Sequence, residues 1–210
     1  TSQPLAAQAG LDILKKGGNA VDAAIATAAC LTVVEPTSNG IGSDAFAIVW
    51  MNGEMYGLNA SGYAPAAISI EALQALGHKE IPRFGMIPVT VPGTPAGWVA
   101  LSKRFGKLPL KEVLKPAITY AKEGYPISPT LGYHWHQVFD IYKTHLKGDA
   151  FKPWFDTFAP HGRAPKVGEI WSSSGHAETL QKIADTHGEA FYKGEIANKI
   201  VDYSHLHGGF

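Results

Sequence analysis

The residue type with the most distinctive chemistry stands first in this chain. A threonine at a mature N-terminus can use its own amine as the base that activates its hydroxyl, which would make Thr1 an N-terminal nucleophile. Such a nucleophile normally begins a β-strand, whereas Pro4 and a helical pattern follow here. We therefore interpret Thr1 as a residue of a longer polypeptide rather than as the nucleophile.

The single cysteine, Cys30, lies between Ala29 and Leu31 in an alanine-rich segment. A nucleophilic cysteine needs an exposed, electropositive environment that favours the thiolate. The apolar neighbours instead predict a small hydrophobic side chain in the core. One cysteine also forms no intrachain disulfide, which leaves the cellular compartment open.

Histidines gather in the segment that contains His134, His136, Asp140 and His145. Ligands on one helix face lie three or four residues apart, and His136 and Asp140 are the pair with the best spacing. Two ligands are too few for a structural zinc site. We predict no metal or cofactor site, and we interpret the segment as an aromatic and histidine-rich surface or a contact with a partner.

A glycine-rich run, Gly-Ile-Gly-Ser-Asp at 40–44, follows a helical pattern and precedes a strand pattern. A dinucleotide-binding turn has the opposite order, because the N-terminus of the helix after the glycines holds the pyrophosphate. Nucleotide binding is therefore the weakest functional alternative, and a nucleotide titration without binding would exclude it.

A loop of small and polar residues, Asn59-Ala60-Ser61-Gly62-Tyr63, leaves the second of two predicted strands. Loops at strand ends often carry binding groups. The same residues also suit an ordinary turn in which Asn59 and Ser61 satisfy backbone groups. Residue types and spacing alone leave both interpretations open, and they reveal no complete catalytic set.

The composition is that of a folded protein. The 210 residues include 18 Lys and Arg and 18 Asp and Glu, a balance that argues against a nucleic-acid-binding protein. Charged residues make up 17% and apolar residues 45%, so much of the chain must be buried in its own core or against a partner. No segment approaches the roughly 18 consecutive apolar residues of a membrane span.

The hydrophobic pattern predicts a mixed α/β chain that contains a hairpin. Gly17 and Gly18 end the first helix, and Asn19 begins the second as its N-cap, with Asp22 in the first turn. The second helix is rich in alanine, and we expect it to be buried nearly all round. The predicted elements are helices over 4–16, 20–34, 68–76, 98–105, 110–123, 177–187 and 195–205, strands over 45–50 and 55–58, a short edge strand over 86–91 and a loop over 150–168.

Several blocks of the sequence resemble the γ-glutamyltranspeptidase family, in the family's own order. They are residues 4–26, 34–36, 40–46, 91–98, 116–128 and 191–197. Because the blocks extend over nearly all 210 residues, the resemblance is specific.

The resemblance implies an N-terminal-nucleophile hydrolase with an αββα sandwich, of the α/β (α+β) class. It implies one precursor that cleaves itself into a large and a small subunit. A threonine freed at the N-terminus of the small subunit attacks a γ-glutamyl amide, its amine acts as the base, and backbone donors hold the oxyanion. The acyl group then passes to water or to an amine.

On this basis residues 1–210 are expected to form the N-terminal portion of the large subunit, and the catalytic threonine lies outside them. Residues 1–100 would supply a helical layer and the central hairpin, and residues 101–210 would be mainly helical. The expected partners are the remainder of the large subunit and the small subunit, besides a small acyl-amide substrate.

Three positions depart from the family pattern. Gln3 stands where the family usually has histidine, and Ser43 follows Gly42 where a second glycine is common. Ser61 takes the position of an arginine that clamps the substrate α-carboxylate in true transpeptidases. Losing that arginine costs about 2–5 kcal/mol and a serine hydroxyl recovers about 0.5–1.5 kcal/mol, which leaves a deficit of about 0.5–4.5 kcal/mol.

We therefore predict a γ-glutamyltranspeptidase-like, or glutathione hydrolase-like, amidohydrolase or acyltransferase in which Ser61, Gly62 and Tyr63 form part of the substrate-binding wall. A glutaryl or cephalosporin acylase-like amidase is the alternative, because its substrates lack the α-amino acid head that needs the arginine. A non-catalytic binding or assembly subunit of the same fold is the second alternative. The sequence leaves the acyl group, the acceptor and the compartment open.

Overall fold

The computed structural model describes residues 1–210, which form ten α-helices, one short 3₁₀ helix and four strands. The helices are α1 (Pro4–Lys15), α2 (Ala20–Val34), α3 (Ile70–Ala75), α4 (Thr94–Phe105), α5 (Leu110–Glu123), α6 (Pro129–His145), α7 (Lys152–Phe158), α8 (Ser174–Thr186), α9 (Glu189–Lys193) and α10 (Glu195–Leu206). The other elements are β1 (Ala45–Met51), β2 (Glu54–Ala60), β3 (Tyr125–Pro126), β4 (Ile170–Trp171) and the 3₁₀ helix η1 (Asp149–Phe151). None of the helices combines the length and the apolar composition that crossing a bilayer requires.

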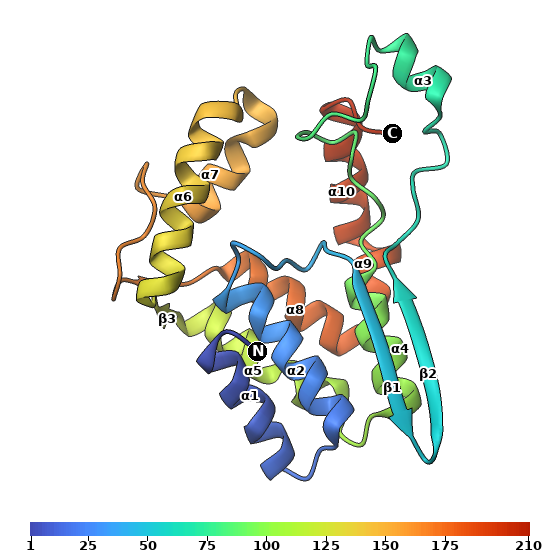
Figure 1. Ribbon diagram of the computed structural model, residues 1–210, viewed down its shortest axis with the longest axis vertical. Helices are drawn as coiled ribbons and strands as arrows, with labels where there is room; N and C mark the ends of the chain where they lie inside the picture. Colours follow the sequence, from blue (N-terminus) through green and yellow to red (C-terminus); the bar gives the residue numbers. More distant parts are fainter.

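Four helices, which we call the helical body, form the centre of the molecule: α1 lies against α2, α2 against α5, and α5 against α8 (Figure 1). Small residues let the axes approach, and a Cβ added at Gly10 of α1 would lie 2.4 Å from Thr27 Oγ1 of α2. Leu114 on α5 is fully buried in the apolar cluster between these helices. As predicted, α2 is buried on most sides, although Ala20 and Ala24 reach solvent.

Asn19 caps the start of α2, as the sequence predicted, and Asp22 makes this cap reciprocal. Asn19 Oδ1 accepts the backbone N–H groups of Val21 and Asp22 at 3.0 Å each, and Asp22 Oδ2 accepts the N–H of Asn19 at 3.0 Å. The same carboxylate accepts the N–H groups of Lys107 and Leu108 at 2.9 and 3.2 Å. These bonds satisfy a fully buried charge, and they join α2 to the turn before α5.

Strands β1 and β2 form the predicted antiparallel hairpin, whose turn is Asn52-Gly53. Both turn residues have positive φ, 55° and 82°, which suits a two-residue turn between right-twisted strands. Helix α4 covers one face, where a Cβ added at Gly97 would lie 3.0 Å from the Cβ of Ala60. The opposite side, which we call the outer face of the hairpin, consists of the paired residues Phe46 and Asn59, Ile48 and Gly57, and Trp50 and Met55.

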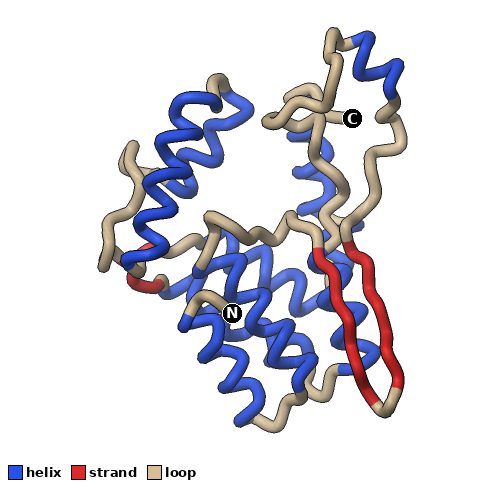
Figure 2. The backbone as a smooth tube through the Cα atoms, viewed as in Figure 1, coloured by secondary structure: helices blue, strands red, loops and turns tan.

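Two arms extend from the helical body in the same direction, one with α6 and α7 and the other with α10 and the loop that carries α3 (Figures 1 and 2). They meet through side chains rather than through a shared sheet. The ring of Phe84 lies against Tyr142 and His145, with centroids 5.9 and 6.0 Å apart. Tyr203 on α10 donates its hydroxyl to the carbonyl oxygen of Ala150 at 2.9 Å.

The predicted edge strand over 86–91 is wrong. The segment makes a turn, closed by the N–H of Val89 on the carbonyl oxygen of Met86 at 3.2 Å. Pro88 has no N–H to give to a neighbouring strand. One hydrogen bond in this segment resembles strand pairing: the N–H of Val91 donates to the carbonyl oxygen of Tyr63 at 2.9 Å.

The predicted loop over 150–168 is wrong in part, because α7 begins at Lys152. Pro153 lies in the first turn of that helix, where its missing N–H breaks no intrahelical bond. Phe158 at the end of α7 stacks on Trp171, with ring centroids 5.9 Å apart and an interplanar angle of 11°. Aromatic packing therefore stabilises a helix in a segment whose prolines suggested a loop.

Candidate functional site

The predicted substrate-binding residues Ser61, Gly62 and Tyr63 directly follow the last residue of β2. Asn59 Oδ1 accepts the backbone N–H of Ser61 at 2.9 Å, so the turn that the sequence suggested is present. Gly62 has a φ of 79°, a conformation that side-chain-bearing residues rarely adopt. The carbonyl oxygen of Tyr63 accepts the N–H of Val91, which belongs to a segment distant in sequence.

Gly62 in this turn and Gly93 in the segment after Val91 lie at a close approach between the two backbones. A Cβ added at Gly62 would lie 1.7 Å from the carbonyl oxygen of Val91, and one added at Gly93 would lie 2.0 Å from the carbonyl oxygen of Ala60. Both obstacles are backbone atoms, which no side-chain rotation can move away. The two segments therefore approach as closely as they do because both positions lack a side chain.

A third segment joins these two at the start of α4. The carbonyl oxygen of Ser43 accepts both the N–H of Thr94 at 3.1 Å and its hydroxyl at 2.7 Å. The glycine-rich run over 40–44 lies between α2 and β1, the order that argued against dinucleotide binding. Its structural partner is the N-terminus of α4.

A hollow of about 540 Å³ is lined by two of these segments, residues 58–63 and the stretch from Val91 into α4, together with Tyr192. Ser61 is half-buried at its wall, whereas the side chain of Tyr63 is 85% exposed. The lining contains no charged side chain and consists of Leu58, Asn59, Ala60, Ser61, Gly62, Tyr63, Val91, Pro92, Gly93, Ala96, Gly97, Ala100 and Tyr192. The hollow thus offers hydroxyl, amide and backbone groups but no cation of its own.

Tyr192 on α9 is a residue of this hollow that the sequence did not single out. Its hydroxyl donates to the carbonyl oxygen of Pro92 at 2.6 Å and accepts the N–H of Ala96 at 3.0 Å. Burial raises the pKa of the Tyr192 phenol, which keeps the hydroxyl neutral and able to donate. The one signal in the sequence was its place in the block over 191–197 that resembles the family.

Cys30 is fully buried in α2, as its apolar neighbours predicted. Burial raises the pKa of its thiol to about 12. Since the thiolate is the nucleophilic form, Cys30 has the properties of a core side chain. Thr1 lies just before α1 rather than at the start of a strand.

The histidine-rich segment forms most of α6, and its histidines point to different partners. His136 Nδ1 lies 3.0 Å from the carbonyl oxygen of Gly132, within the same helix. His145 stacks on Phe84 of the other arm. No three His, Cys, Asp or Glu side chains of the chain come together as a metal ion requires.

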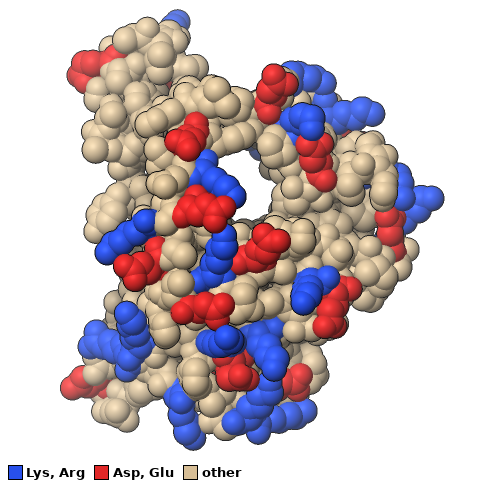
Figure 3. Space-filling model, turned by 180° about the vertical axis from the view of Figure 1, so that it is seen from behind, with Lys and Arg blue, Asp and Glu red and all other residues tan.

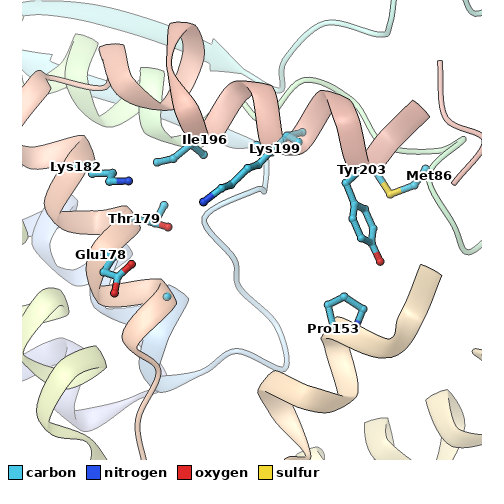
Figure 4. A pocket seen from close by; sticks show the side chains of 10 residues that line it. Met86, Pro153, Glu178, Thr179, Lys182, Ile196, Lys199 and Tyr203 are labelled. Carbon is cyan, nitrogen blue, oxygen red and sulfur yellow. The ribbon is translucent and has the colours of Figure 1, made fainter. Parts of the chain in front are cut away.

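A second hollow, of about 510 Å³, lies between α7, α8 and α10 (Figure 4). Lys182 on α8 and Lys199 on α10 both bind Glu195, at 2.9 and 2.5 Å, and they lower the pKa of that carboxyl to about 2. Seen from behind, positive and negative side chains alternate around an opening between the two arms (Figure 3). The Lys182–Glu195 pair joins α8 to α10, whereas Lys199 and Glu195 lie on the same helix. Exposed ion pairs of this kind contribute little to stability.

Comparison with known proteins gives a consistent result. A family model described as gamma-glutamyltranspeptidase matches residues 6–210. Glutathione hydrolase proenzyme 1 of Schizosaccharomyces pombe is 35% identical over 211 residues, which cover 100% of this chain and 32% of that protein. The chain therefore spans about a third of the length of this curated relative.

Solved structures match over the whole chain. The crystal structure of cephalosporin acylase from Bacillus halodurans has a TM-score of 0.98 and 60% identity, covering 100% of this chain and 39% of that one. The gamma-glutamyltranspeptidase from Pseudomonas nitroreducens, complexed with L-DON, has a TM-score of 0.86 and 33% identity, covering 100% of this chain and 60% of that one.

Proposed function

The chain belongs to the γ-glutamyltranspeptidase family, and from that premise we propose that it is the N-terminal portion of the large subunit of a self-processing amidohydrolase. The observation that carries the proposal is the arrangement of residues 40–46, 61–63 and 91–98: the last two segments line one hollow, and Ser43 of the first binds Thr94 of the last. The first and last of these segments are blocks of the family resemblance. The middle one holds the position of the substrate-clamping arginine.

The remainder of the protein supplies the nucleophile in this proposal. The hydroxyl of an N-terminal threonine attacks the acyl carbonyl, and its own amine takes the hydroxyl proton and delivers it to the leaving amine. Water or an acceptor amine then releases the acyl group from the threonine. The role of Ser61, Gly62 and Tyr63 is to bind the acyl group and to orient its carbonyl towards that threonine.

The outer face of the hairpin supports the expected division of the protein. Ile48 and Trp50 on this face are 80% and 71% exposed, and a two-stranded hairpin alone is marginally stable in water. We propose that the rest of the large subunit and the small subunit add strands and cover this face. In this proposal residues 1–100 provide a helical layer and the central hairpin, and residues 101–210 are mainly helical.

The uncharged hollow favours a second candidate for the acyl group. A γ-glutamyl head brings an ammonium and a carboxylate, and neither finds an opposite charge in the lining. A glutaryl group lacks the ammonium, so fewer charges must leave water when it binds. We therefore propose turnover of glutaryl or related acyl amides in preference to γ-glutamyl amides, in the manner of an acylase.

The experiment compares hydrolysis of γ-glutamyl and glutaryl 4-nitroanilides by the full-length protein. We expect a higher kcat/KM for the glutaryl amide in the wild type. Ser61→Arg is expected to raise kcat/KM for the γ-glutamyl amide, about twofold at the lower end of the deficit of about 0.5–4.5 kcal/mol and about two-thousandfold at its upper end. Ser61→Ala, the control, removes a hydroxyl and adds no cation, so it does not raise the γ-glutamyl rate.

Each outcome has a distinct meaning. If Ser61→Arg leaves γ-glutamyl hydrolysis unchanged, the placement of Ser61 at the carboxylate position is wrong. If the wild type hydrolyses neither amide after processing, the second alternative, a non-catalytic binding or assembly subunit, replaces the enzyme.

A further inference from the structure

The contacts of Tyr192 extend the proposed function, on which this inference rests. We infer that Tyr192 is a positioning residue whose hydroxyl fixes the wall of the acyl pocket from a separate helix. It acts through backbone groups of the segment over 91–97 rather than by touching the reacting atoms.

The Tyr192 hydroxyl satisfies both ends of a turn. It donates to the carbonyl oxygen of Pro92 and accepts the N–H of Ala96, with distances of 2.6 and 3.0 Å. Helix α4 begins after Gly93, which makes no side-chain cap, so the N–H of Ala96 has no partner within the helix. Tyr192 therefore provides the missing cap from 96 residues away in sequence.

The turn transmits this constraint to the pocket wall. Pro92 is covalently linked to Gly93, whose backbone lies against that of Ala60 and Gly62 without room for a Cβ. On its other side Pro92 follows Val91, whose N–H holds the carbonyl oxygen of Tyr63. A shift of the turn must therefore move the segment over 60–63, which carries the proposed acyl contacts.

Helix α9 is anchored in the core next to Tyr192. Phe191 is buried in the apolar cluster, and its ring lies 5.0 Å from that of Tyr192 at an interplanar angle of 69°. Tyr192 also lines both the uncharged hollow and a mostly apolar hollow of about 480 Å³ beside α10. The hydroxyl therefore connects a fixed element to the more exposed pocket wall.

The test is Tyr192→Phe in the full-length protein, which removes the hydroxyl and retains the ring. Because the wall contacts substrate and transition state alike, we expect KM for the preferred anilide to rise about two- to tenfold while kcat stays within twofold. Tyr203→Phe is the matched control, since its hydroxyl bonds the carbonyl oxygen of Ala150 away from this wall. That variant is expected to leave KM and kcat unchanged.

A second measurement separates this inference from the proposed function. Hydrogen exchange of the amides over 91–97 is expected to accelerate in Tyr192→Phe and not in Tyr203→Phe, whether or not the protein hydrolyses an anilide. Equal KM values and equal exchange in the two variants would overturn the role of Tyr192. An inactive wild type in which Tyr192→Phe still loosens this segment would overturn the amidohydrolase and leave the positioning contact standing.

Discussion

The helical body and the hairpin differ in how far their apolar side chains are buried. In the body, α1, α2, α5 and α8 turn their apolar sides towards one another, and side chains such as Leu114 and Cys30 are fully buried. In the hairpin, α4 covers one face, and the outer face leaves Phe46, Ile48 and Trp50 largely exposed. The chain thus contains one region whose apolar side chains are mostly buried within it, and a hairpin that is covered on one face only.

This difference suggests that the body governs folding stability and that the hairpin governs substrate binding. The body obtains its stability from burial, so substitutions there act on folding. The hairpin ends at the hollow beside Ser61, so its geometry matters for binding more than for the stability of these 210 residues. Substitutions in each region therefore test this division.

The largest effect is expected from Leu114→Ala in the body. Leu114 has no exposed surface, and removing such a side chain leaves a cavity that costs about 2–5 kcal/mol. Chemical denaturation should show this loss as a lower midpoint with an unchanged slope. Leu206→Ala, at a side chain that is 75% exposed, is the control and should change stability by less than about 0.5 kcal/mol. Similar losses for both variants would contradict the description of the body.

A smaller loss of stability, with a large loss of activity, is expected from Gly93→Ala. The new Cβ would meet the carbonyl oxygen of Ala60, and forcing the two backbones apart costs about 1–3 kcal/mol. In the full-length protein we expect kcat/KM for the preferred anilide to fall at least tenfold. Gly175→Ala in the first turn of α8, where a Cβ meets nothing within 4 Å, is the control and should lower neither quantity. An active Gly93→Ala would show that the close approach is dispensable.

A pH effect is expected in the body at His176. Its Nδ1 lies 2.8 Å from Ser173 Oγ and its ring packs against Phe158 and Trp171. Burial lowers the pKa of His176, so below about pH 6.5 the unfolded chain binds a proton that the folded chain does not. Its contribution is therefore complete above that pH and is lost as the pH falls, by at most about 1.4 kcal/mol per pH unit.

The measurement is the free energy of unfolding between pH 7.5 and 5.5. His176→Asn should flatten this dependence, because asparagine offers a side-chain oxygen to Ser173 and does not titrate in this range. His134→Asn, at an exposed position of α6, should leave the dependence as in the wild type. The same pH dependence in all three proteins would argue against burial of His176.

In the 210-residue chain, the smallest effect is expected from Trp50→Thr on the outer face of the hairpin. Threonine suits a strand, and Trp50 is 71% exposed, so the stability of the 210-residue chain should change by less than about 0.5 kcal/mol. In the full-length protein, where we propose that the face is covered, the loss should reach about 3 kcal/mol. Equal effects in both proteins would mean that this face is not an internal interface.

Local rules predicted the elements that local bonds define. Asn19 and Asp22 lie three residues apart and cap α2, and Asn52-Gly53 adopts the left-handed turn of the hairpin. The rules failed where packing decides. The segment over 86–91 reads as a strand by composition but has no neighbouring strand, and α7 is helical because Phe158 packs on Trp171.

The candidate site shows the same division. Its location at Ser61, Gly62 and Tyr63 came from the family pattern and from the end of a predicted strand, and its role in binding remains a proposal. Tyr192 could not be found from residue types, because its hydroxyl bonds Pro92 across 100 positions of sequence. Such contacts become visible when helices far apart in sequence are packed together.

The sequence by itself determined the helix caps, the hairpin turn and the order of the family-like blocks, because each depends on neighbours a few residues apart. The tertiary structure alone decided that Gly62 and Gly93 lie back to back, that Tyr192 caps α4, and that the hollow beside Ser61 carries no charge. These features depend on burial of the helical body, which brings distant segments together and fixes the distances between them.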